Sequence, residues 1–181
     1  MKRKNAGYSL VELVIVLGII AVLSGLAAVT ISAITTARAT SAKESFNEEL
    51  STLQTMTKSQ DKDSAILVEK VDGKYQLTYG TFSGNKAVST DFADKTKFTA
   101  DSSKDVVILD RVKIMYAASS SDTAKELTEV NPSGIMIIMF DKADGRVLSG
   151  SGIYTFNKDR SDNSVGRVTL NKTTGSHYTG S

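Results

Sequence analysis

Apolar residues run almost without interruption through the first part of the chain and then become periodic. From Leu10 to Ile31 the only charged residue is Glu12. A helix of that length, rising about 1.5 Å per residue, reaches roughly 33 Å, which is enough to cross the hydrocarbon of a bilayer. Beyond this run, apolar residues recur at spacings of three and four, the period of one buried helical face; they are Ala39, Ala42, Phe46, Leu50, Leu53 and Met56. The pattern predicts one helix from Tyr8 to Thr57, apolar all round in its first half and amphipathic in its second.

After residue 59 the pattern changes to short stretches with β character. Ala65–Val71 and Lys74–Phe82 flank Asp72-Gly73, a dipeptide typical of hairpin turns. Further strands are predicted over Asp105–Ala117, Gly134–Asp141, Arg146–Ser149, Ile153–Asn157 and Val165–Asn171. The remaining segments are predicted as a loop over Ser83–Lys104, a short helix over Asp122–Val130 and a frayed tail over Thr173–Ser181. The predicted fold class is α+β, with a long N-terminal helix packed on a C-terminal antiparallel sheet.

The composition excludes several kinds of site. The 181 residues carry 22 basic and 20 acidic side chains, so bulk charge gives no case for nucleic-acid binding. The absence of cysteine excludes disulfides, thiolate metal sites and a cysteine nucleophile. The single histidine, His177, lies in the tail that is predicted to fray, so a Ser-His-Asp triad would depend on a mobile residue. We therefore expect a protein that is not an enzyme and needs no cofactor.

Glu12 is the residue that needs an explanation. Burying a carboxylate in hydrocarbon without a partner costs free energy on the order of several kcal/mol. An ordinary secretory signal would have a shorter apolar core, no acid within it and a cleavage site of small residues after it. A plain single-span anchor accounts for the length, and the basic Lys2, Arg3 and Lys4 would keep the N-terminus cytoplasmic. Ser9 and Glu12 also fit the S-x-x-E capping box, which predicts that the helix begins near Ser9. The anchor and the capping box leave a functional role for Glu12 open.

The residues around this acid resemble a known family. Gly7-Tyr8-Ser9-Leu10-Val11-Glu12-Leu13, with the basic leader before it, is similar to the prepilin signature of type IV pilins and type II secretion pseudopilins. The resemblance implies that a dedicated membrane peptidase cuts after Gly7 and that the new N-terminal residue, Tyr8, is methylated. Glu12 would then be the acid that sets the register between assembled subunits. Phe is more usual than Tyr at position 8, and Val29 stands where many pilins have a helix-breaking Pro.

The same resemblance implies the pilin fold and a division of the chain. Residues 1–7 would be the leader, 8–31 a transmembrane and filament-core helix, 32–58 its amphipathic continuation, and 59–181 a globular β-rich head domain. Loss of the leader would turn the small positive charge balance into a small negative one. The chain would be a single-pass protein of the bacterial cell membrane before assembly. Afterwards it would be part of an extracellular pilus or of a cell-envelope pseudopilus.

The leading hypothesis is a structural subunit of a type IV pilus. Its implied partners are itself and other pilins, the prepilin peptidase, a pilus assembly ATPase with its membrane platform, and the membrane. Two alternatives stay open: a minor pilin or pseudopilin of a type II secretion or DNA-uptake machine, and a non-polymerising membrane-anchored surface binding domain. Adhesion, motility and uptake are not separated by the sequence.

Few residues of the predicted head suggest chemistry. Asp141–Gly145 and Asp159–Asn163 could suggest calcium loops, but they lack the alternating oxygen ligands and the distal Glu of an EF-hand, so β-turns are favoured and no metal site is predicted. Asn171-Lys172-Thr173 fits the short glycan acceptor pattern. The aromatic Tyr75, Tyr79 and Phe82 are predicted to pack in the core, and His177 is predicted to be solvated.

Overall fold

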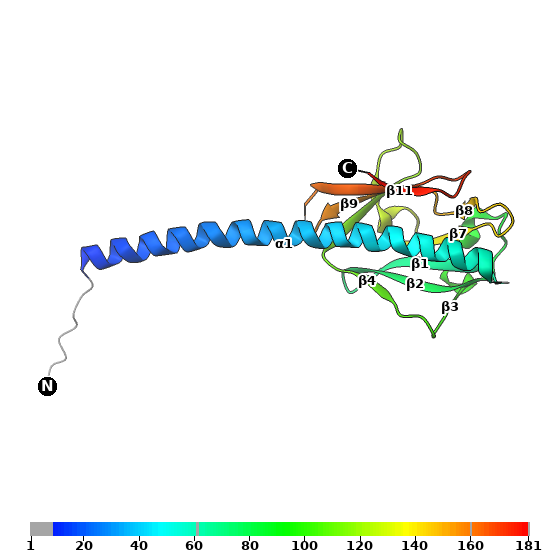
Figure 1. Ribbon diagram of the computed structural model, residues 1–181, viewed down its shortest axis with the longest axis horizontal. Coiled ribbons are helices and arrows are strands. Elements are labelled where there is room, and N and C mark those ends of the chain that lie inside the picture. Colours follow the sequence, from blue (N-terminus) through cyan, green and yellow to red (C-terminus); the bar gives the residue numbers. More distant parts are fainter. Residues whose placement is uncertain (1–8, 61, 160, 181) are drawn as a thin grey trace. The chain divides into compact units, whose positions relative to one another are not determined.

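The computed structural model describes residues 9–60, 62–159 and 161–180, without the side chains of residues 26–30. A single helix, α1, runs from Leu10 to Ser59, as the hydrophobic pattern predicts (Figure 1). Its backbone stays helical through Val29, the position where many pilins have Pro. The chain divides into two compact units, residues 1–35 and residues 36–181.

The second unit contains two antiparallel sheets where the sequence predicts one. Sheet A has the order β3-β2-β1-β7-β8, with β4 also paired to β2, and sheet B has the order β11-β10-β9-β5-β6. The strands of sheet A are β1 (Ser64–Val71), β2 (Lys74–Phe82), β3 (Phe98–Ala100), β4 (Val107–Leu109), β7 (Ile135–Phe140) and β8 (Val147–Ser149). Those of sheet B are β5 (Val112–Ala117), β6 (Lys125–Glu126), β9 (Gly152–Lys158), β10 (Ser164–Leu170) and β11 (His177–Gly180). The fold is α+β, with the strands after the helix.

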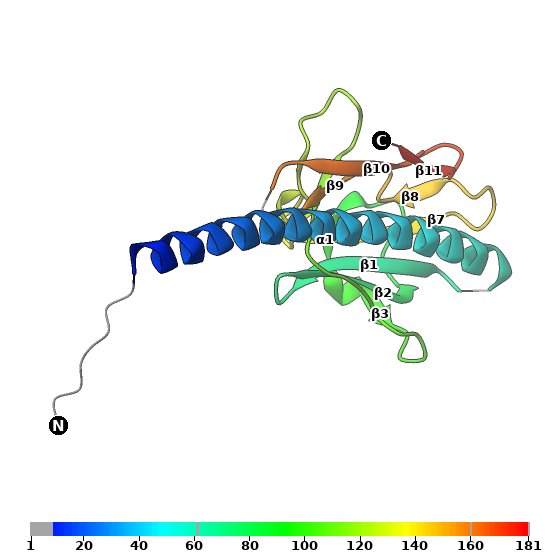
Figure 2. The ribbon, with the colours of Figure 1, turned by 60° about the vertical axis from the view of Figure 1, so that its left-hand side comes forward.

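One apolar core joins residues 36–59 of α1 to both sheets. The predicted helical stripe is buried from Ala39 to Leu53, and Met56 is partly buried at its end. Phe46 packs against two rings of β9, with ring centroids 4.8 Å from Tyr154 and 5.5 Å from Phe156. On the sheet A side, the hydroxyl of Tyr79 donates to the Glu49 carboxylate and to the Glu49 backbone oxygen. Figure 2 shows this part of α1 between β9–β11 on one side and β1–β3 on the other.

The predicted hairpin and the predicted strand Gly134–Asp141 are confirmed. β1 and β2 pair in register from Ser64 opposite Thr81 to Val71 opposite Lys74, around a turn at Asp72 and Gly73. Both turn residues have positive φ, 50° and 77°. Two-residue hairpin turns commonly have this conformation, because its twist matches the right-handed twist of the flanking strands. β7 is buried at every position, as its continuous apolar sequence predicts.

The predicted strand Asp105–Ala117 is wrong, because it is two strands in different sheets. β4 pairs with β2 in sheet A, and β5 pairs with β9 in sheet B. Between them Arg111 has φ 54°, in the left-handed region that reverses an extended chain. The Asp110 carboxylate beside it accepts from the Arg38 guanidinium at 2.7 Å, so the connection between β4 and β5 contacts α1.

Two segments predicted as irregular or helical also differ. The predicted loop Ser83–Lys104 holds two 3₁₀ turns, η1 (Ser89–Ala93) and η2 (Lys95–Lys97), followed by β3. Phe92 of η1 stacks on Phe82, with ring centroids 4.4 Å apart, and belongs to a second core on the far face of sheet A. The predicted helix Asp122–Val130 is instead β6 followed by a 3₁₀ turn, η3 (Leu127–Glu129).

The predicted frayed tail is wrong as well, because His177–Gly180 within it form β11. This strand pairs with β10 from Leu170 opposite His177 to Arg167 opposite Gly180. Gly175 lies in the turn between the two strands with φ 69°. A Cβ at this glycine would collide with the carbonyl oxygen of Gly145 in the turn between β7 and β8. The tail is therefore held by a ladder and by a close contact between two turns.

Gly175→Ala is expected to destabilise the fold by about 2–3 kcal/mol. The cost of a left-handed backbone at alanine adds to the cost of the steric collision of its Cβ. The matched control is Gly73→Ala, which has the same kind of φ but open space around its Cβ and should cost only about 1 kcal/mol. Urea denaturation of the two variants measures both values. Equal losses would contradict the proposed contact between the turns.

Glu126 of β6 links the two sheets. Its carboxylate accepts from Lys70 at 2.7 Å and from the hydroxyl of Tyr75 at 3.0 Å, and both donors belong to sheet A. Burial raises the pKa of this carboxyl, but the hydrogen bonds from Lys70 and Tyr75 outweigh it and hold the pKa below its ordinary value of 4.5.

Because the folded pKa of Glu126 is lowered, its contribution to stability is fully present above pH 4.5 and is lost as the pH falls through the folded value. Glu126→Gln is expected to cost about 1–2 kcal/mol at pH 7, where a charged acceptor is lost. The difference from the original chain should shrink below pH 4.5. Denaturation curves recorded from pH 7 to pH 3 test this, and a difference that grows on acidification would contradict the assignment.

Candidate functional site

The start of α1 is fixed by a reciprocal pair of hydrogen bonds between Ser9 and Glu12. The backbone N–H of Glu12 donates to the Ser9 hydroxyl at 3.2 Å, and the backbone N–H of Ser9 donates to Oε2 of Glu12 at 2.9 Å. The first helical bond follows at once, from the N–H of Leu13 to the carbonyl of Ser9. The predicted capping box is therefore confirmed, and it satisfies two backbone donors that a helix start leaves free.

This geometry places the Glu12 carboxylate at the positive end of the helix dipole, where a negative charge is stabilised. Among the described residues, hydrogen bonds reach only Oε2, so Oε1 keeps its full capacity to accept from another group. The side chain is exposed. A carboxylate held in this way can receive a cation that approaches the helix start from outside the chain.

The apolar side chains that follow are exposed along the first unit. Leu10 is 80% exposed, and Leu23, more than three turns later, is still 60% exposed. The other large apolar side chains exposed here are Val11, Leu13, Val14, Ile15, Val16, Leu17, Ile19, Ile20, Val22, Ile31 and Ile34. Soluble monomers rarely expose a contiguous apolar surface of this size. The segment therefore calls for apolar surroundings that the described chain does not supply.

The hydroxyls of Ser24 and Thr35 are satisfied by the helix itself. The Ser24 hydroxyl donates to the carbonyl of Ile20 at 2.7 Å, and the Thr35 hydroxyl donates to the carbonyl of Ser32 at 3.0 Å. Hydroxyls bonded to the preceding turn can enter an apolar environment at low cost. Glu12 is consequently the one acidic group that a partner of residues 10–25 would have to accommodate.

Part of the site that the sequence predicts precedes the first described residue. Gly7, Tyr8 and the basic Lys2, Arg3 and Lys4 lie outside the described residues. Within the residues that the structure does describe, no helix is long and apolar enough to cross a membrane. The membrane-spanning first half that the sequence predicts is thus not confirmed.

The acidic loops of the head are turns with partners inside the chain. Asp141 accepts from the N–H of Ala143 at 2.8 Å and lies 3.4 Å from the Arg146 guanidinium, in the turn between β7 and β8. Asp144 faces the same guanidinium at 3.5 Å. Across the described ranges, no three His, Cys, Asp or Glu side chains gather closely enough to hold a metal ion.

The predicted core aromatics are confirmed, and the prediction for His177 is wrong. Tyr75, Tyr79 and Phe82 are all buried. His177 is only partly exposed, and its Nε2 lies 2.8 Å from the hydroxyl of Ser51 on α1. The imidazole thus fastens β11 to the helix instead of lying in solvent.

The comparison with known families agrees with this site. Residues 2–28 match the family model described as the prokaryotic N-terminal methylation motif, which is the signature of type IV pilins and pseudopilins. No curated protein and no solved structure matches the chain. The motif supports a general role of the pilin or pseudopilin kind, with a membrane-anchored precursor, other pilins and a prepilin peptidase as partners.

Proposed function

We propose that the chain is the precursor of a type IV pilus subunit, a structural protein that catalyses no reaction. The peptidase cuts after Gly7, Tyr8 becomes the methylated N-terminus, and the subunits polymerise through the apolar part of α1. Before assembly this apolar part holds the precursor in the cell membrane with its leader inside. An assembly ATPase and its membrane platform then move subunits into the filament.

The observation that carries this proposal is the exposed apolar helix headed by the Ser9–Glu12 capping box. Packing residues 10–25 against the same segments of other copies removes their apolar side chains from water. Each buried Å² contributes about 25 cal/mol. A filament core of such helices gives the segment the apolar surroundings that it lacks in the single chain.

Cleavage supplies the partner for Glu12. The cut leaves a cationic amine on Tyr8, and in an apolar core that amine and the Glu12 carboxylate of a neighbouring subunit would each be costly alone. Together they attract by about 4 kcal/mol at roughly 4 Å and an effective dielectric of 20. The oxygen Oε1 is open to this amine, while Oε2 remains engaged by the helix start. The pair fixes the axial register between subunits.

The cleavage step can be tested by expressing the chain with and without a prepilin peptidase. The expected result is a chain that has lost the mass of residues 1–7 and gained the mass of one methyl group, and only when the peptidase is present. A non-polymerising surface domain on a plain anchor predicts an uncut N-terminus under both conditions. An unchanged mass in a strain whose own pilin is processed would overturn the proposal.

The share of the chain in sheared fibres separates a major subunit from a minor one. A major pilin dominates the sheared material, whereas a minor pilin or pseudopilin is a trace component or stays in the envelope. The match over residues 2–28 fits either kind of subunit. Both a major and a minor subunit need the exposed apolar helix for packing against other subunits.

A further inference from the structure

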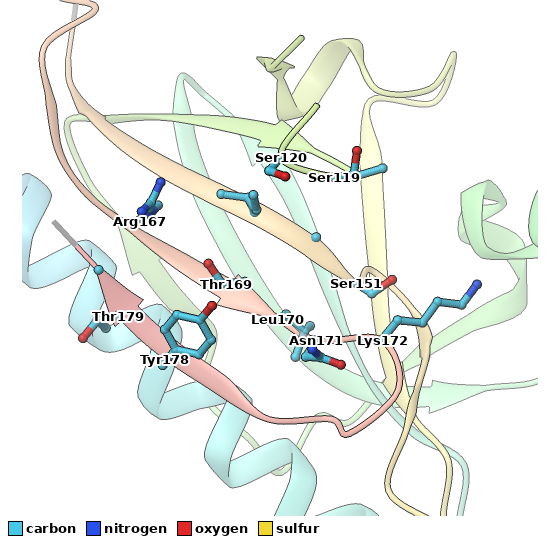
Figure 3. Close-up of a pocket in the computed structure, with 14 residues that line it drawn as sticks. Ser119, Ser120, Ser151, Arg167, Thr169, Leu170, Asn171, Lys172, Tyr178 and Thr179 are labelled. Atoms are coloured by element: carbon cyan, nitrogen blue, oxygen red, sulfur yellow. The ribbon is translucent and has the colours of Figure 1, made fainter. Parts of the chain in front are cut away.

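A groove of about 530 Å³ lies on the outer face of sheet B, away from the core (Figure 3). Three parts of the chain form it: the loop after β5, the start of β9, and the hairpin of β10 and β11. Its lining residues are Ala118, Ser119, Ser120, Ser151, Gly152, Ile153, Arg167, Thr169, Leu170, Asn171, Lys172, Tyr178, Thr179 and Gly180. None of these residues takes part in the N-terminal site.

The strand register explains how the floor of the groove forms. Thr169 of β10 pairs with Ile153 of β9 on one side and with Tyr178 of β11 on the other. Side chains at paired positions point to the same face of a sheet. Tyr178 is 59% exposed, so its ring lies open beside Thr169.

The charge of the lining is one-sided. Arg167 and Lys172 are basic, and the lining contains no acidic residue. Within the described part of the chain, neither of the two cations forms an ion pair. They lie at opposite ends of the groove in Figure 3. Both cations can therefore receive anionic groups from outside, in a chain whose overall charge is nearly balanced.

The remaining polar groups are mostly hydroxyls and one amide. The Asn171 carbonyl oxygen Oδ1 accepts from the N–H groups of Thr173 and Thr174, which leaves the amide N–H₂ to donate to a ligand. The Ser151 backbone carbonyl is fixed by the hydroxyl of Tyr116 at 2.6 Å. The Ser119 hydroxyl, by contrast, already donates to the Asp122 carboxylate at 2.8 Å.

From this set of groups we propose that the groove binds an acidic saccharide, a sugar chain that carries carboxylates. The open tyrosine ring offers an apolar face on which a sugar ring can stack. The hydroxyls of the lining serines and threonines other than Ser119 match the hydroxyls of a sugar, and Arg167 and Lys172 bind its carboxylates. A single-stranded nucleic acid is less well matched, because such ligands use several aromatic side chains to stack successive bases.

The full chain in detergent micelles, titrated calorimetrically with an oligogalacturonate, tests this proposal. We expect binding that weakens as the salt concentration rises and no binding of a neutral dextran oligomer of equal length. Tyr178→Ala and Lys172→Gln should each weaken binding about tenfold, which corresponds to about 1.4 kcal/mol. The matched controls are Ile108→Ala, an exposed apolar residue of β4, and Lys104→Gln, and both should bind normally.

Three results would overturn the proposal: no binding of the oligogalacturonate, equal binding of the neutral dextran, or tighter binding of a single-stranded oligonucleotide. Circular dichroism of each variant checks that it is folded, so a loss of binding is not mistaken for a loss of structure. The measurement requires neither cleavage nor fibres, so its outcome is independent of the proposed pilus function.

Discussion

Glu12→Ala is expected to leave cleavage after Gly7 intact and to reduce the yield of sheared fibres to background. In the proposed filament, this substitution removes the carboxylate of the register pair and leaves the amine of the neighbouring Tyr8 buried without a partner. Losing one member of a buried pair costs about 3–5 kcal/mol at each subunit contact. Immunoblots of the cell fraction and of the sheared fraction separate processing from assembly.

Two further variants separate the charge of Glu12 from its role in the capping box. Glu12→Gln keeps an oxygen that can accept from the N–H of Ser9 but loses the negative charge, so it should also fail to assemble. Ser9→Ala removes the hydroxyl that accepts from Glu12 and weakens the helix start by about 1 kcal/mol, yet it keeps the charge and should assemble. The reverse pattern, fibres from Glu12→Gln and none from Ser9→Ala, would show that capping alone is required.

Phe46→Ala is expected to cause the largest loss of stability of any single substitution discussed for the head, about 3–5 kcal/mol. The ring is fully buried and packs on Tyr154 and Phe156, so its removal leaves a cavity between α1 and sheet B. The apolar wall around that cavity cannot collapse without moving the helix. Chemical denaturation followed by near-ultraviolet circular dichroism, which reports on the tyrosine environment, measures the change.

The control for Phe46 is Glu48→Ala, which changes an exposed residue on the same helix and should alter stability by at most about 0.5 kcal/mol. A loss below about 1 kcal/mol for Phe46→Ala would contradict the packing of α1 on sheet B.

Features with a local cause could be predicted from the sequence. The capping box depends on two residues three apart, and the hairpin depends on Asp72-Gly73. The buried stripe of α1 follows from the helical period, which is fixed by backbone geometry. The continuous apolar run of β7 likewise predicts a strand covered on both faces.

Features that depend on distant pairing could not be predicted. The break between β4 and β5 falls at Asp110 and Arg111, where no glycine or proline marks a turn. The sequence of β11 has the pattern of a polar tail, because the groups that hold it lie elsewhere in the chain. These are the backbone of β10, with which β11 pairs, and the hydroxyl of Ser51, which contacts His177. The groove on sheet B could not be predicted from the sequence for the same reason, since three separate segments line it.

The most direct test of the proposed function is N-terminal sequencing and mass analysis of the chain recovered from sheared fibres. The expected result is a mature chain that begins with N-methyl-Tyr8 and lacks residues 1–7. A chain that retains Met1 and the leader, or one that never appears in the sheared fraction while remaining intact in the membrane, would contradict it.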